Sequence, residues 1–247
     1  MGVSLTSSDG SRGPGLKVLA IIPARGGSKR ILHKNIRKFH GRPMLSYSLK
    51  TAENSGLFEH IHVSTDDDQI AQVAKDAGHP VTFKRDDRLA DDQTGVVAVL
   101  KNDLAEFESL GETYDAVVMI LACAPLLLPS DLTGAMDLYL RRGEKHPVMA
   151  VCKFPVPPEW AFTMSDEGEL TPADPQAILR NSQTFPERYF DAASFIVFPS
   201  PVLRSAEPCD IPYIGYELPP YRAVDIDVED DWRTAELIYG GLLNEAK

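Results

Sequence analysis

Cysteine is scarce in this 247-residue sequence, which has only Cys123, Cys152 and Cys209 and no C-x-x-C pair. An odd number of widely spaced cysteines predicts neither a disulfide framework nor a structural zinc site. Long apolar runs are missing as well, since no stretch approaches the roughly 18 residues of a membrane span and no charged and apolar leader opens the chain. We therefore expect a cytoplasmic protein that acts without a membrane.

Acidic residues are missing from residues 10–52, although this stretch holds 10 of the 25 lysines and arginines of a chain whose formal net charge is −11. The overall acidity argues against nucleic acid as a partner, because a surface that follows a phosphate backbone needs widely spread positive charge. One basic stretch in an acidic protein instead favours a local pocket for a small polyphosphate.

The basic stretch contains an apolar run over residues 18–22, which ends at Pro23 and predicts a buried strand feeding a loop. In that loop, Gly26 and Gly27 let backbone N–H groups approach phosphate oxygens, and Ser28 adds a hydroxyl donor. Three cations are placed to neutralise such a ligand: Arg25, Lys29 and Lys34. The spacing fits neither a P-loop nor a dinucleotide-binding fingerprint, and a solvated basic loop is the simpler alternative.

Strands and amphipathic helices alternate from residue 16 to residue 153, which predicts an α/β fold with a mostly parallel sheet and helices on both faces, Rossmann-like in type. Strands are expected over residues 60–64, 81–83 and 114–122, and a helix is expected to begin at Pro43. Residues 154–193, rich in proline and aromatic side chains, break the alternation and predict an inserted subdomain. The α/β domain resumes over residues 194–247, and residues 1–15 predict a flexible tail.

Two features lie where we expect the functional edge of the sheet. The strand over residues 114–122 ends in the turn Ala122-Cys123-Ala124-Pro125, which should face the same crevice as the basic loop. We do not expect Cys123 to be a nucleophile, since no histidine is paired with it. Further along, Asp225 and Asp227 flank Ile226 and project to one face of an extended segment. Two converging carboxylates predict a Mg²⁺ site completed by substrate phosphates and water.

Residues 22–35 resemble the N-terminal signature of the CMP-sialate synthetase family, I-P-A-R-x-x-S-K-x-x-x-x-K-N. Here it reads Ile22-Pro23-Ala24-Arg25-Gly26-Gly27-Ser28-Lys29, followed by Lys34-Asn35. The D-I-D sequence at 225–227 is similar to the metal-binding motif of that family. The A-x-A-P turn that begins at Ala122 is similar to the branch that activates pseudaminic acid, and residues 180–193 partly match the same branch.

The resemblance implies an enzyme that transfers CMP from CTP to the anomeric hydroxyl of a nonulosonic acid, with pseudaminic acid as the expected acceptor and pyrophosphate as the second product. It also implies a homodimer, with the inserted subdomain making the contact. The alternatives are other acceptors, namely N-acetylneuraminic acid, legionaminic acid or Kdo, or a non-catalytic protein that binds a nucleotide or sugar on the same scaffold.

The resemblance further implies roles for individual residues. The catalytic residues would be Arg25, Lys34 and Asp225, and the metal would bind Asp225 and Asp227. The nucleotide would contact Ala24, Arg25, Gly26, Gly27, Ser28, Lys29, Asn35, Arg85 and Asp92. The sugar acid would contact Ala122, Gln183 and Tyr189.

Overall fold

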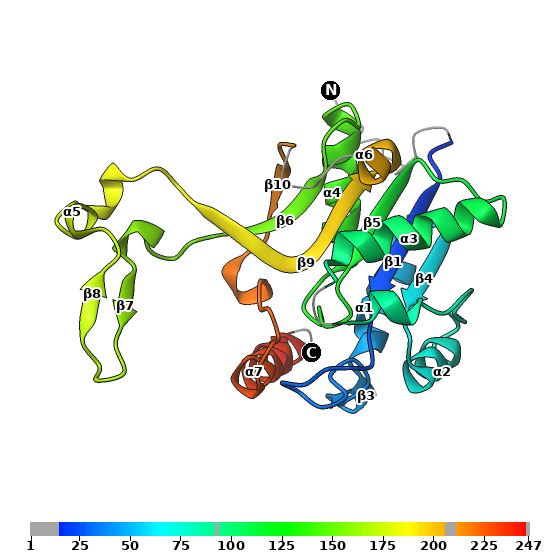
Figure 1. Ribbon diagram of the computed structural model, residues 1–247, viewed down its shortest axis with the longest axis horizontal. Coiled ribbons are helices and arrows are strands. Elements are labelled where there is room, and N and C mark those ends of the chain that lie inside the picture. Colours follow the sequence, from blue (N-terminus) through cyan, green and yellow to red (C-terminus); the bar gives the residue numbers. More distant parts are fainter. Residues whose placement is uncertain (1–14, 92–93, 206–210, 246–247) are drawn as a thin grey trace, which may run out of the picture.

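The computed structural model describes residues 15–91, 94–205 and 211–245, which form an α/β protein (Figure 1). Its strands are β1 (Val18–Pro23), β2 (Lys38–Phe39), β3 (Arg42–Pro43), β4 (His60–Ser64), β5 (Ala116–Ile120), β6 (Val148–Lys153), β7 (Phe162–Met164), β8 (Leu170–Pro172), β9 (Tyr189–Pro199) and β10 (Ile214–Glu217). Its helices are α1 (Leu45–Ser55), α2 (Asp68–Asp76), α3 (Val96–Ser109), α4 (Pro129–Arg141), α5 (Pro175–Ile178), α6 (Ser200–Ser205) and α7 (Glu229–Glu245). Residues 1–14 of the expected tail, and Asp92, lie outside the described residues.

The main sheet has the strand order β10-β6-β9-β5-β1-β4 among the described residues. Strand β1 pairs in parallel with both β4 and β5, and β10 pairs in parallel with β6, whereas β9 runs antiparallel between β5 and β6. The predicted mostly parallel sheet is therefore confirmed. Because β1, β4 and β5 are parallel, the loops after these three strands meet at one edge of the sheet.

Helices cover both faces of the sheet, and β1 shows how the sequence produces the two layers. Its alternate residues point to opposite sides: Leu19 and Ile21 pack with α3 and α6, while Ala20 and Ile22 pack with α1, α2 and α4. All four side chains are fully buried, which is why this strand reads as a continuous apolar run. Within the described residues, no helix is both long and apolar enough to cross a membrane.

Two local predictions about elements are wrong. Residues 81–83 form a bend instead of a strand, because the Arg85 N–H donates to the Thr65 carbonyl at 2.9 Å and the chain thus crosses the end of β4 instead of pairing along it. Helix α1 begins at Leu45, two residues after Pro43, which forms a short antiparallel bridge with Lys38 instead.

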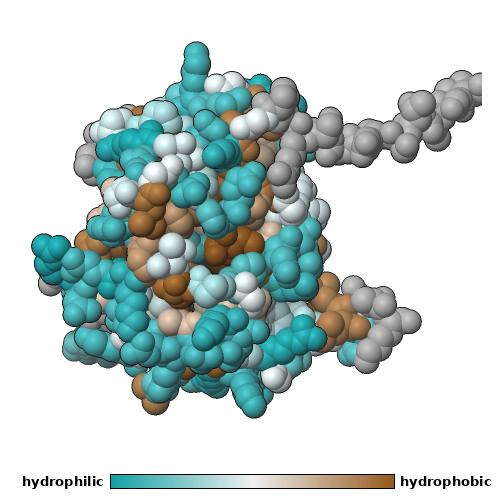
Figure 2. All heavy atoms as spheres, turned by 90° about the vertical axis from the view of Figure 1, so that its right-hand side faces the viewer, coloured by the Kyte–Doolittle hydropathy of each residue, from teal (hydrophilic) through white to brown (hydrophobic). Residues whose placement is uncertain are grey.

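An arm leaves the sheet after β6 and returns as β9 (Figure 1). It carries the antiparallel pair β7 and β8 and the short helix α5. Residues 189–193, which the sequence placed in the inserted subdomain, lie in β9 and pair in part with β6. Several large apolar side chains are exposed on the arm: Val156, Phe162, Met164, Leu170 and Leu179. By contrast, the face of the molecule shown in Figure 2 is largely hydrophilic, with small apolar areas near its middle.

His62 is a buried histidine whose two ring nitrogens have no hydrogen-bond partner among the described residues. Its ring packs against Phe83, with centroids 4.4 Å apart, and against Phe107, with centroids 5.3 Å apart. Burial, with smaller contributions from the charges of Arg85 and His60, lowers the pKa of His62 to about 4. The folded protein therefore keeps this ring neutral under conditions in which an unfolded chain would protonate it.

We expect His62→Phe to make the folded protein less sensitive to acid. The folded pKa lies below the unfolded value, so the titration of His62 costs no stability above about pH 6.5 and costs progressively more as the pH falls toward 4. The difference between the two pKa values corresponds to about 3 kcal/mol. Urea unfolding at pH 7 and pH 4.5 measures it, with the exposed His146→Phe as the control. Equal losses of stability in wild type and His62→Phe would contradict this assignment.

Candidate active site

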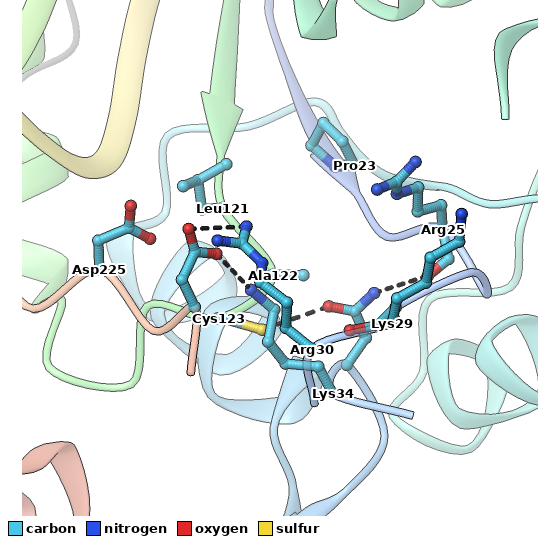
Figure 3. A pocket seen from close by; sticks show the side chains of 12 residues that line it. Pro23, Arg25, Lys29, Arg30, Lys34, Leu121, Ala122, Cys123 and Asp225 are labelled. Carbon is cyan, nitrogen blue, oxygen red and sulfur yellow. Dashed lines mark hydrogen bonds and ion pairs between the residues drawn. The ribbon is translucent and has the colours of Figure 1, made fainter. Parts of the chain in front are cut away.

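The carboxyl ends of β1 and β5 open onto one cavity of about 450 Å³ (Figure 3). The segment that precedes α7 completes its wall. The cavity is lined by Pro23, Arg25, Ser28, Lys29, Arg30, Lys34, Asn35, Leu121, Ala122, Cys123, Asp225 and Asp227. Figure 3 shows Asp225 at one end of the cavity and Arg25 and Lys29 at the other. The site therefore combines cations with carboxylates, as a polyphosphate with a bound cation requires.

The loop after β1 is held in place by Asn35. The side-chain Nδ2 of Asn35 donates to the Arg25 carbonyl at 2.9 Å, and the Cys123 thiol donates to Asn35 Oδ1 at 3.3 Å. Asn35 is buried, so its amide is a rigid link between the basic loop and the turn after β5. The guanidinium of Arg25 donates to the Asp91 carbonyl at 2.8 Å.

Gly26 occupies a place that no side chain fits. Its N–H donates to Asp66 Oδ1 at 3.1 Å, and an added Cβ would lie 2.5 Å from Asp67 Oδ2. Asp67 cannot easily move away, because it caps α2 by accepting from the N–H groups of Gln69 and Ile70. Gly26 thus lets the basic loop approach the start of α2 closely. An added Cβ at Gly27 meets no atom within 4 Å.

Lys34 connects the basic loop to the carboxylate segment, 192 residues further along the chain. Its Nζ donates to the Ile226 carbonyl at 2.5 Å and lies 3.3 Å from Asp227 Oδ1. Arg30 Nη2 lies 2.8 Å from Asp227 Oδ2 (Figure 3). The backbone N–H of Asp227 donates to Asp231 Oδ2 at 2.9 Å, which fixes the segment to the first turn of α7.

Asp225 is the second carboxylate of the site. It keeps contact with solvent, yet desolvation by the surrounding protein raises its pKa, and the negative charge of Asp227 raises it further. The positive charge of Lys34 opposes this shift. Two carboxylates that repel each other across a polar cavity are a donor set that suits a hard divalent cation.

The donor set fits Mg²⁺ as a partly protein-bound ion. The described residues contain no cluster of three or more histidine, cysteine, aspartate or glutamate side chains that could enclose a metal. Asp225 and Asp227 would therefore supply the protein oxygens, and the rest of the octahedron would come from phosphates and water. This is the usual arrangement for Mg²⁺ that arrives with a nucleotide.

Most residues predicted for the site are brought together by the fold. The cavity lining includes Arg25, Ser28, Lys29, Lys34, Asn35, Ala122, Asp225 and Asp227. Ala24 is buried in the core, and Gly26 and Gly27 belong to the loop but do not line the cavity. Ser28 lines the cavity, with its hydroxyl donating to the Ile31 carbonyl at 2.6 Å.

Three other predicted residues lie away from the cavity. Arg85 is buried and donates to Ser64, from Nη2 to the carbonyl at 2.6 Å and from Nε to the hydroxyl at 3.0 Å. Gln183 lies on the arm, in a 3₁₀ turn over Ser182–Thr184, and Tyr189 begins β9. Asp92, as noted, is outside the described residues.

Arg30 and Cys123 line the cavity but were not predicted as site residues. Arg30 directly follows Lys29 in the acid-free stretch, so its position in the sequence was a usable signal. The contact between Cys123 and Asn35 joins residues 88 positions apart and could be seen only in the fold.

Cys123→Ala should weaken catalysis without unfolding the protein. Burial raises the pKa of the thiol to about 12, so Cys123 stays protonated and donates to Asn35. Losing this hydrogen bond costs about 1 kcal/mol, which corresponds to a decrease of about fivefold in kcat/KM for the nucleotide. Cys123→Ser keeps a donor and should recover part of the loss. Identical kinetics for alanine variant and wild type would contradict a positioning role.

Solved structures share the α/β fold of this chain. A solved structure of a CMP:2-keto-3-deoxy-manno-octonic acid synthetase complexed with CTP matches with a TM-score of 0.67 at 15% identity, covering 91% of this chain and 99% of the other. A 4-diphosphocytidyl-2C-methyl-D-erythritol synthase matches with a TM-score of 0.63 at 12% identity, covering 92% of this chain and all of the other. At these identities the likeness shows the fold.

Sequence comparison gives the family. The family model described as cytidylyltransferase matches residues 19–234, and this chain belongs to that family. Pseudaminic acid cytidylyltransferase from Campylobacter jejuni subsp. jejuni serotype O:2 is 34% identical over 225 residues, which cover 91% of this chain and 97% of the relative. N-acylneuraminate cytidylyltransferase A from Danio rerio is 28% identical, over 89% of this chain and 50% of that relative.

Proposed function

We propose that this protein transfers CMP from CTP to the anomeric hydroxyl of pseudaminic acid, a nonulosonic acid, and releases pyrophosphate. The observation that carries the proposal is the 34% identity to a pseudaminic acid cytidylyltransferase over 91% of this chain and 97% of that relative. It is supported by a cavity that is lined by the cations Arg25, Lys29, Arg30 and Lys34 and by two carboxylates, Asp225 and Asp227.

In the proposed reaction, the anomeric oxygen attacks the α-phosphorus of CTP. A new P–O bond forms, the bond from the α-phosphorus to the β-phosphate oxygen breaks, and the hydroxyl proton is released. Arg25, Lys29 and Lys34 would bind the triphosphate and stabilise the charge that develops on the leaving pyrophosphate. Asp225 and Asp227 would hold Mg²⁺, which supplies charge neutralisation at the phosphate oxygens.

The homodimer is also a proposal. The arm carries exposed apolar side chains, among them Met164, Leu170 and Leu179. Its β7, β8 and α5 extend away from the main sheet (Figure 1). A second copy of the chain is the partner that we propose for it, and light scattering that gives the monomer mass would contradict it. The compartment we propose is the cytoplasm, with Cys123 and Cys152 kept as free thiols.

The test is pyrophosphate release with CTP and Mg²⁺ in the presence of pseudaminic, legionaminic or N-acetylneuraminic acid or Kdo. We expect the highest kcat/KM with pseudaminic acid, and little release when ATP, GTP or UTP replaces CTP. A preference for another acid would keep the reaction and overturn the acceptor. Binding of CTP without turnover across the whole panel would favour a non-catalytic nucleotide-binding protein.

A further inference from the structure

Both oxygens of Asp227 are engaged by cations of the protein itself. Lys34 Nζ lies 3.3 Å from Oδ1, and Arg30 Nη2 lies 2.8 Å from Oδ2 (Figure 3). Within the described part of the chain, Asp225 has no ion pair of this kind. Of the two carboxylates proposed to bind the metal, Asp227 is therefore paired with cations of the protein, whereas among the described residues Asp225 is not.

The two cations differ in how firmly they are held. The Lys34 side chain is 20% exposed and is also bound to the Ile226 carbonyl, so it is fixed in the wall of the cavity. The Arg30 side chain is 65% exposed, and Asp227 is the one ion-pair partner that the described residues give it. An exposed ion pair is weak and exchanges readily. Arg30 is thus the cation that can leave Asp227 at little cost.

We propose that Arg30 is a positioning residue that couples metal binding to nucleotide binding: it neutralises Asp227 in the nucleotide-free protein and moves to the triphosphate when CTP enters. This inference rests on the proposed function, because it takes CTP and Mg²⁺ as the ligands of the site. It adds a residue and an order of events that the proposed reaction does not require.

The chemistry of the groups favours such an exchange. A guanidinium forms planar, paired hydrogen bonds with phosphate oxygens, and a triphosphate carries more negative charge than one carboxylate. A divalent cation held by Asp227 would take the place of one of the two cations on its oxygens, and Arg30 is the more exposed of the two. The metal and Arg30 therefore compete in the free protein, and the nucleotide removes the competitor. By linkage, CTP must raise the affinity for metal by the same factor as the metal raises the affinity for CTP.

The experiment measures Mn²⁺ binding by electron paramagnetic resonance, without sugar acid so that no turnover occurs. Wild-type protein should bind Mn²⁺ weakly alone and more tightly with CTP. Arg30→Gln should bind Mn²⁺ about threefold more tightly in the absence of CTP, and the factor by which CTP improves binding should fall correspondingly. Arg30→Lys keeps a cation at this position and should behave more like wild type.

Arg42→Gln is the matched control, because Arg42 is exposed, belongs to the same basic stretch and does not line the cavity. It should leave Mn²⁺ binding unchanged, and equal gains in both glutamine variants would reduce the effect to net charge and overturn the proposal. Asp227→Asn distinguishes a failure of the Arg30 exchange from a failure of the metal assignment. If Asp227→Asn loses Mn²⁺ while Arg30→Gln equals wild type, the exchange alone is wrong. If Asp227→Asn binds Mn²⁺ normally, the metal assignment and the exchange are both wrong.

Discussion

Asp225→Ala should lower kcat by about 10²–10³ while the melting temperature stays close to that of the wild type. Interactions that stabilise charge in the transition state are each worth roughly 3 kcal/mol, and Asp225 would contribute through the cation between it and the phosphates. The cost to folding should be small. The carboxylate keeps contact with solvent, and its raised pKa shows that the fold does not favour its charged form.

The measurement is kcat for pyrophosphate release at saturating CTP, beside thermal unfolding of the same preparations. Asp230→Ala is the matched control, because Asp230 is an exposed acid in the first turn of α7 that does not line the cavity. It should retain nearly full activity. Full activity in both Asp225→Ala and Asp227→Ala would remove the metal assignment.

Lys34→Met should have the larger effect on kcat/KM for CTP, a decrease of about 10³ or more. The ammonium group holds the Ile226 carbonyl and faces Asp227, and it would also bind the triphosphate. Its loss removes one phosphate contact and loosens the segment that carries Asp225 and Asp227. Lys34→Arg should recover only part of the activity, because a guanidinium cannot reproduce the short contact of a compact ammonium.

Steady-state kinetics with varied CTP separates these contributions, since a pure binding defect raises KM with kcat unchanged. Lys50→Met is the control, because Lys50 is an exposed lysine of α1 that pairs with Glu53. A kcat within about twofold of wild type for Lys34→Met would show that Lys34 acts on binding alone and is not catalytic.

Strong local signals explain why much of the fold could be predicted. The strand predicted over residues 60–64 has the bounds that the structure gives, since the apolar spacing of a strand is visible in the sequence. Asp67 is the N-cap of α2, as its place before an acidic first turn indicates. The bend at 81–83 could not be foreseen, because Phe83 is apolar in order to pack on His62 rather than to pair in a sheet.

In the site too, local motifs could be predicted and long-range contacts could not. The basic loop and the two carboxylates could be recognised because each is a compact motif with its chemistry within a few residues. The sequence could not show how the motifs meet, because the contact of Lys34 with Ile226 joins residues 192 positions apart and depends on how Ile226 and α7 pack against Phe39 and Met44. Arg85 shows the reverse case: the resemblance implied a nucleotide contact, whereas the fold buries its guanidinium and pairs it with Ser64.

The most direct test of the proposed reaction is the stoichiometry of products with CTP, Mg²⁺ and pseudaminic acid. Mass spectrometry would quantify the CMP-linked sugar acid while pyrophosphate is measured in the same reaction. We expect one pyrophosphate for each CMP-sugar formed, and no pyrophosphate when the sugar acid is left out. Pyrophosphate released at the same rate without any acceptor, or CTP bound with no CMP-linked product, would contradict it.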